Sequence, residues 1–189
     1  DSIQFIILMI LLALSAFFSS AETALTTVNR IRMRSLAEDG NSRAACVLKV
    51  TDDSGKMLSA ILIGNNIVNL SASSIATSLA LDLWGSVGAG IATGILTLLI
   101  LIFGEITPKT IAAQKAEKVA LAVVKIISFC VLVFRPVVAV LNVVTGGLIR
   151  LLGCNPNEKA PLITEAELKT MVNVSHEEGV LELDERTMI

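Results

Sequence analysis

The 189-residue chain is far more apolar than one soluble core requires, with 53% hydrophobic residues and a mean hydropathy of +0.76. This composition predicts a membrane protein. The net charge of -2 combines basic loops with an acidic C-terminal stretch, and no basic patch indicates binding to nucleic acid. The three cysteines are odd in number and lack metal-ligand spacing, which argues against a disulfide framework. Because the chain starts without methionine and stops inside a helical pattern, we expect it to be processed or trimmed.

Three apolar segments are long enough to cross a membrane as helices. The first covers residues 3–27, which would reach about 37 Å at ~1.5 Å per residue. The second and third cover residues 57–83 and 87–106, and the tight connection between them contains Trp84, a residue type common at bilayer interfaces. The predicted fold class is therefore an all-α membrane protein, with three transmembrane helices interrupted by polar residues.

Lys and Arg are concentrated in two of the connecting segments. Residues 28–56 contain six of them and residues 107–118 contain three, whereas residues 84–86 contain none. Since basic loops remain on the cytoplasmic side, we expect a multi-pass protein of the cell membrane. Its N-terminus would lie outside the cell.

A fourth apolar stretch, residues 119–152, is harder to place. Lys125 and Pro136 divide it into pieces of about 16 residues, shorter than the ~20 needed to span a bilayer. We favour a broken juxtamembrane helix in the cytoplasmic interface. The alternative is one tilted crossing with a kink at Pro136, which would place the acidic C-terminal stretch outside the cell.

Residues 153–189 are predicted to form a cytoplasmic acidic helical segment. Thr164 with Glu167 three residues later forms a capping box, and Gly179 is a suitable helix end. The many acidic side chains indicate either a solvated face or a contact that is sensitive to divalent cations or made between subunits.

Three polar motifs interrupt the predicted membrane helices: "SSAE" at 19–22, "GNNIVN" at 64–69 and "GEITPK" at 104–109. In the expected orientation all three lie toward the cytoplasmic half of the membrane, so they can meet. Ionisable groups inside membrane helices are costly and usually face a cavity or a partner. The motifs offer only oxygen ligands, which suit hard cations such as Mg²⁺ or Na⁺.

Helix geometry suggests how these oxygens could be presented. Asn65 and Asn69 are four residues apart and share a helix face, and Asn66 is three residues from Asn69. Pro108 has no N–H, so in an α-helix the carbonyl of Gly104 loses its partner and is free beside the carboxylate of Glu105. Pro108 and Pro136 are thus both candidate hinges.

Each of these polar groups also has a purely structural interpretation. Asn and Ser often hydrogen-bond neighbouring membrane helices. Glu22 could pair with Arg30 or another loop residue, and Glu105 could pair with Lys109 one turn later. An intramembrane enzyme using the two glutamates as acid and base is disfavoured, because there is no nucleophile–base constellation. We therefore do not expect an enzyme.

Taken together, "FFSSAETAL", "LIGNNIVNL", "FGEITPKTIA" and the tail "ITEAELKTMVNVSHEEGVLELDERTMI" resemble the transmembrane domain of the CorC/CNNM family of magnesium transporters. The resemblance covers essentially the whole chain. It implies three transmembrane helices, a belt-like juxtamembrane helix over residues 119–152 and an acidic helical bundle. It also implies a homodimer and a cytoplasmic pair of ATP-binding CBS domains, which these 189 residues do not include.

The resemblance implies Mg²⁺ export coupled to Na⁺ entry, with a dehydrated Mg²⁺ held among three helices. An alternative is a membrane-anchored Mg²⁺ sensor or scaffold that regulates other transporters. The positions that match the family's motifs are Ser20, Asn65, Asn69, Gly104 and Glu105. Adjacent second choices for the metal site or ion pathway are Ser19, Glu22 and Asn66.

Overall fold

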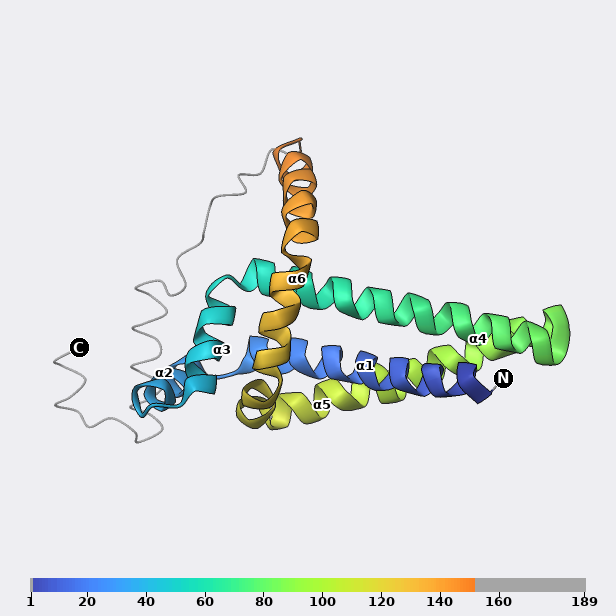
Figure 1. The fold of residues 1–189 in the computed structure, drawn as a ribbon, viewed down its shortest axis with the longest axis horizontal. Coiled ribbons are helices and arrows are strands. Elements are labelled where there is room, and N and C mark those ends of the chain that lie inside the picture. The colour runs from blue at the N-terminus through green and yellow to red at the C-terminus, as the bar shows by residue number, and fades with distance from the viewer. Residues whose placement is uncertain (1, 152–189) are drawn as a thin grey trace, which may run out of the picture. The chain divides into compact units, whose positions relative to one another are not determined.

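The computed structural model describes residues 2–151, and all of its regular structure there is helical (Figure 1). Its elements in chain order are α1 (Ser2–Thr27), α2 (Arg30–Glu38), α3 (Ser42–Asp52), α4 (Ser54–Leu99), the π-helix η1 (Ile100–Ile106), α5 (Thr107–Gln114) and α6 (Ala116–Leu151). The prediction of an all-α fold is confirmed. The expected acidic segment at 153–189 lies outside the described residues.

Within the described residues, four stretches are long and apolar enough to cross a membrane: Ile3–Thr27, Ser54–Asp82, Thr93–Gln114 and Ala116–Leu148. The first three correspond to the predicted membrane helices. The fourth lies in α6, which runs as one helix with Pro136 inside it. The prediction that this stretch is broken into two pieces is therefore wrong. An internal proline removes one hydrogen bond, and a long helix tolerates that loss when its remaining bonds continue.

α4 is two helices joined at Gly85, whose backbone has φ 69° and ψ -163°. A positive φ of this kind favours glycine, since it has no Cβ to clash. The chain reverses there, and η1 and α5 return alongside α1 (Figure 1). The expected tight connection between the second and third apolar segments is confirmed. The side chain of Trp84 lies outside the described set.

The helix widens to a π-helix at "ILIFGEI", just before Pro108. The Thr107 N–H donates to the carbonyl of Ile102, five residues earlier. The α-helical register expected from the sequence at this point is therefore wrong. In the π register the missing N–H of Pro108 would have served Phe103, whereas in the α register it would have served Gly104. Both carbonyls thus lie where the hydrogen-bond register changes.

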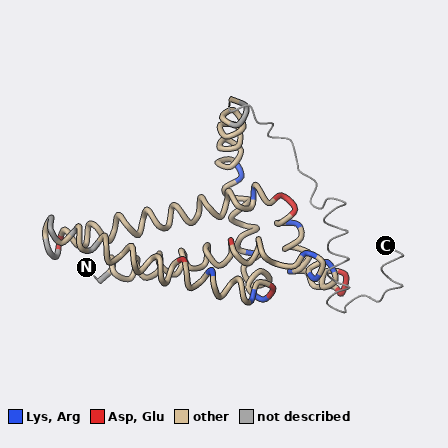
Figure 2. The backbone as a smooth tube through the Cα atoms, turned by 180° about the vertical axis from the view of Figure 1, so that it is seen from behind, with Lys and Arg blue, Asp and Glu red and all other residues tan. Residues whose placement is uncertain are grey.

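The basic loop between α1 and α4 folds into two short capped helices. The Asn29 side chain accepts hydrogen bonds from the N–H groups of Ile31 and Arg32 at 2.9 and 3.1 Å. Asn41 caps α3 in the same way. Asparagine at an N-cap satisfies N–H groups that have no partner within the helix. In residues 2–143, most of the charged residues belong to these helices and the adjoining helix ends (Figure 2).

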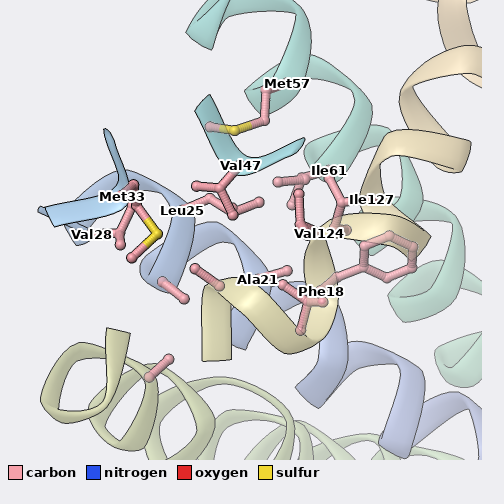
Figure 3. Packing of buried hydrophobic residues seen from close by; sticks show 14 of the residues in the cluster. Phe18, Ala21, Leu25, Val28, Met33, Val47, Met57, Ile61, Val124 and Ile127 are labelled. Carbon is pink, nitrogen blue, oxygen red and sulfur yellow. The ribbon is translucent and has the colours of Figure 1, made fainter. Parts of the chain in front are cut away.

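The main hydrophobic core lies where α1, the loop helices, the start of α4 and the start of α6 meet (Figure 3). Phe18 and Leu25 of α1 pack there with Met57 and Ile61 of α4 and Ile127 of α6. Large apolar side chains elsewhere on α1 and α4 are exposed. Outward-facing apolar surface of this extent is typical of helices in contact with lipid.

Candidate ion-binding site

One face of α1 carries hydroxyl groups that have no hydrogen-bond partner. Ser15 and Ser19 are four residues apart and each is only 1% exposed. Neither Oγ has a partner within the described structure. Ser20 is half-buried, and its hydroxyl donates to the carbonyl of Pro108 at 3.5 Å. The serine motif of α1 therefore faces both the helix interface and the start of α5.

Two half-buried amides of α4 turn their side-chain oxygens into the protein. The Oδ1 atoms of Asn65 and Asn69 are buried and have no partner in the described structure. Their spacing of four residues places them on one face. Asn66 is exposed, so the structure does not bring this second-choice residue to the same face.

A glycine contact fixes where α4 meets α1. A Cβ added at Gly64 would lie 2.6 Å from the ring of Phe18, so glycine allows a close approach that alanine would not. Gly64 is the neighbour of Asn65, and Phe18 is the neighbour of Ser19. The unpartnered amide and hydroxyl oxygens therefore occupy the same level of the α1–α4 interface.

A second glycine contact fixes where η1 meets α1. Gly104 is buried, and a Cβ added there would lie 3.0 Å from the Oγ of Ser15. Ser15 therefore joins the candidate site, and the sequence analysis did not name it because the segment was treated as apolar up to Phe18. Its spacing of four residues from Ser19 is the signal that could have revealed it.

The two carboxylates of the motifs share one cation. The Nζ of Lys109 lies 3.2 Å from Oε2 of Glu22 and 3.3 Å from Oε1 of Glu105. The pairing of Glu105 with Lys109 was one of the alternatives considered from sequence. Glu22 pairs with Lys109 and not with Arg30, whose nearest acidic partner is Asp52 at 3.9 Å.

The site is rich in neutral oxygens and poor in charged ligands. Among the residues that the structure describes, five side-chain oxygens are buried without a partner, and four of them belong to Ser15, Ser19, Asn65 and Asn69. The same part of the chain contains no cluster of three or more His, Cys, Asp or Glu. Buried polar atoms are normally satisfied, and unpartnered ones call for an explanation. A hard cation would satisfy them, since amide, hydroxyl and carboxylate oxygens are its preferred ligands.

The fold and this site together define a multi-pass helical membrane protein with an oxygen-rich polar site between its helices. Residues 6–185 match the family described as the cyclin M (CNNM) transmembrane N-terminal domain. The chain therefore belongs to the CNNM family, also called CorC/CNNM, as its motifs predict. This is a family of membrane domains and not of enzymes.

Relatives with similar sequences occur in bacteria and plants. The chain is 42% identical over 176 residues to a UPF0053 protein of Haemophilus influenzae, covering 93% of the chain and 42% of the relative. It is 39% identical over 163 residues to the UPF0053 inner membrane protein YfjD of Escherichia coli, covering 86% and 38%. A chloroplastic DUF21 domain-containing protein of Arabidopsis thaliana is 37% identical over 186 residues, covering 98% and 28%. The chain thus spans less than half the length of these relatives.

Proposed function

We propose that this chain is the membrane part of a Mg²⁺ transporter that exports Mg²⁺ in exchange for Na⁺. The observation that carries the proposal is the set of buried, unpartnered oxygens on α1 and α4. These oxygens suit a hard cation in general. The resemblance to the CorC/CNNM magnesium transporters implies that this cation is Mg²⁺. Mg²⁺ is the transported substrate here and not a resident cofactor.

The available oxygens match what Mg²⁺ requires. Mg²⁺ prefers about six oxygen ligands in near-octahedral geometry and gives up water reluctantly. Ser19 or Ser20, Asn65 and Asn69 would supply neutral oxygens, the backbone near Gly104 a carbonyl, and Glu105 a charge. A site with one carboxylate binds a divalent cation more weakly than a site with several, so the ion can be released.

Lys109 gives this site an internal cation that competes with the substrate. Its ammonium group balances Glu22 and Glu105 when no ion is bound. A Mg²⁺ that binds Glu105 must replace Lys109 there, because two cations cannot share one carboxylate without repulsion. Lys109 can keep Glu22 as its partner during this exchange, so neither charge is left without a counter-ion.

The arrangement of the full protein is part of the same proposal. The N-terminus lies outside the cell, α6 forms a juxtamembrane belt, and the acidic segment leads into cytoplasmic CBS domains of a homodimer. The basic loops support this orientation. The chain covers less than half of the length of these relatives, so a full-length protein of their size has room for additional domains. Labelling single cysteines from each side of the membrane tests the orientation directly.

Flux measured on the full-length protein tests the proposed activity. Proteoliposomes loaded with a Mg²⁺-sensitive dye would be given Mg²⁺ with and without an opposing Na⁺ gradient, for wild type and Glu105→Gln. Flux that follows the Na⁺ gradient and vanishes in the variant supports an exchanger built on this site. Binding of Mg²⁺ without any flux would instead identify a Mg²⁺ sensor or scaffold.

A further inference from the structure

A cavity lies outside the candidate ion site, within residues 2–143. It has a volume of about 880 Å³ and is lined by residues of α3, the first turn of α4 and one face of α6. Four of its lining side chains are cations: Lys49, Lys56, Lys125 and Arg135. None of the proposed ion ligands lines it.

The cavity has an excess of positive charge. Its lining includes no carboxylate from the described part of the chain. Lys56 is paired with Asp53 at 2.6 Å, but Lys49, Lys125 and Arg135 form no ion pair with any residue that the structure describes. Like charges gathered around one space repel each other, and an anion in that space would relieve the repulsion.

The same cavity has an apolar wall. Phe129 and Leu132 line it, and both are exposed, by 65% and 64%. Lys125, Phe129, Leu132 and Arg135 are separated by four, three and three residues, so they share one face of α6. A free phosphate would use only the cations. A molecule with an anionic head and a hydrocarbon chain would use both kinds of surface.

The position of the cavity favours a lipid as that molecule. Lys56 lies in the first turn of the candidate span Ser54–Asp82, and the α6 residues belong to the candidate span Ala116–Leu148. The cavity thus lies beside the start of the α4 span and the middle of the α6 span, on the side that the basic loops place in the cytoplasm. Basic pockets at this level between membrane helices are suited to the head groups of anionic lipids.

We propose that this cavity binds one anionic phospholipid. Lys49, Lys125 and Arg135 hold the phosphate, and an acyl chain lies along Phe129 and Leu132. The site does not depend on the proposed Mg²⁺ transport, because it shares no residue with the ion site. A lipid bound in this cavity would contact α3, α4 and α6 at the same time.

Native mass spectrometry of the full-length protein tests this directly. The protein would be released from detergent containing equal amounts of phosphatidylglycerol and phosphatidylcholine. We expect wild type to retain one phosphatidylglycerol in preference to phosphatidylcholine. Lys125→Gln with Arg135→Gln should reduce that retention roughly 25-fold, at about fivefold for each cation near an anionic surface. Phe129→Ser should also reduce retention, which a site for free phosphate would not show.

The matched control is Lys115→Gln with Lys118→Gln, which removes the same charge from exposed positions outside the cavity. This variant should retain the lipid like wild type, and circular dichroism should show equal helicity for all variants. Equal retention in both double variants, or displacement of the lipid by millimolar inorganic phosphate, would overturn the proposal. Carbodiimide cross-links from Lys49 or Lys125 to carboxylates of residues 158–185, without bound lipid, would assign the cavity to the chain's own acidic segment.

Discussion

Lys109 of α5 reaches Glu22 of α1 across the helix interface, with 3.2 Å between Nζ and Oε2. The same ammonium group lies 3.3 Å from Oε1 of Glu105, which is four residues earlier in the chain and belongs to η1. Two of the three polar motifs are therefore joined by a single cation. The third motif joins them through the contact of Gly64 with Phe18. Residues more than 80 positions apart in sequence thus lie together in the candidate site.

Replacing Lys109 with Met should strengthen Mg²⁺ binding. The substitution keeps most of the side chain's volume but removes the cation that competes for Glu105. We expect the Mg²⁺ affinity to rise roughly two- to fivefold, a modest change because partly exposed ion pairs are weak. Isothermal titration calorimetry measures this, and Lys115→Met, an exposed lysine at the end of α5, is the matched control. A loss of affinity comparable to that of Glu105→Gln would show that Lys109 organises the site and does not compete within it.

Asn65→Ala and Asn69→Ala should each weaken Mg²⁺ binding, whereas Asn66→Ala should not. The first two amides are buried without a partner, and the third is exposed. All three variants lose the same amide group from positions within five residues of one another in α4, so helix propensity changes equally. Calorimetric Mg²⁺ affinity should fall about tenfold or more for the buried pair, since each lost ligand is worth roughly a charge-assisted hydrogen bond. Equal affinities for all three variants would reduce Asn65 and Asn69 to packing residues.

Gly64→Ala should destabilise the protein by about 1 to 3 kcal/mol, because the added Cβ would lie 2.6 Å from the Phe18 ring. Thermal unfolding in detergent measures the change. Gly55→Ala, in the first turn of the same helix, is the control, since its nearest contact would be an ordinary 3.7 Å. Combining Gly64→Ala with Phe18→Leu should restore part of the loss. If the two glycine variants melt alike, the helices do not meet as closely as the structure shows.

Helix periodicity and hydropathy were sufficient to predict most of the fold. The first apolar segment, the reversal near Gly85 and the shared face of Asn65 and Asn69 all follow from local rules. The continuity of α6 corresponds to the alternative interpretation and not to the favoured one. The favoured interpretation considered the hydrogen bond lost at Pro136 and not the apolar helix on both sides of it.

The details of the candidate site depend on contacts between helices, which residue spacing along the chain does not predict. Ser15 becomes part of the site only because Gly104 packs against it. The π register before Pro108 shifts which backbone carbonyl loses its partner. Glu22 had several candidate cations within reach along the chain, and only the packing of α1 against α5 selects Lys109.

Ser19→Ala should separate ion binding from stability. A buried hydroxyl without a partner has a desolvation cost that nothing offsets in the ion-free protein. Removing it should leave the ion-free protein as stable as wild type, or more stable by up to about 1 kcal/mol, while Mg²⁺ affinity falls. Thermal unfolding with and without Mg²⁺ measures both effects, because a ligand that binds only the folded state raises its melting temperature.

The pattern across three serine variants makes this test specific. Ser15→Ala should behave like Ser19→Ala if its hydroxyl also serves the ion, and Ser74→Ala, at an exposed position of α4, should change neither quantity. A drop in ion-free stability for Ser19→Ala with an unchanged Mg²⁺-dependent shift would contradict the prediction. It would mean that the hydroxyl holds α1 against its neighbours through a hydrogen bond and has no part in binding the ion.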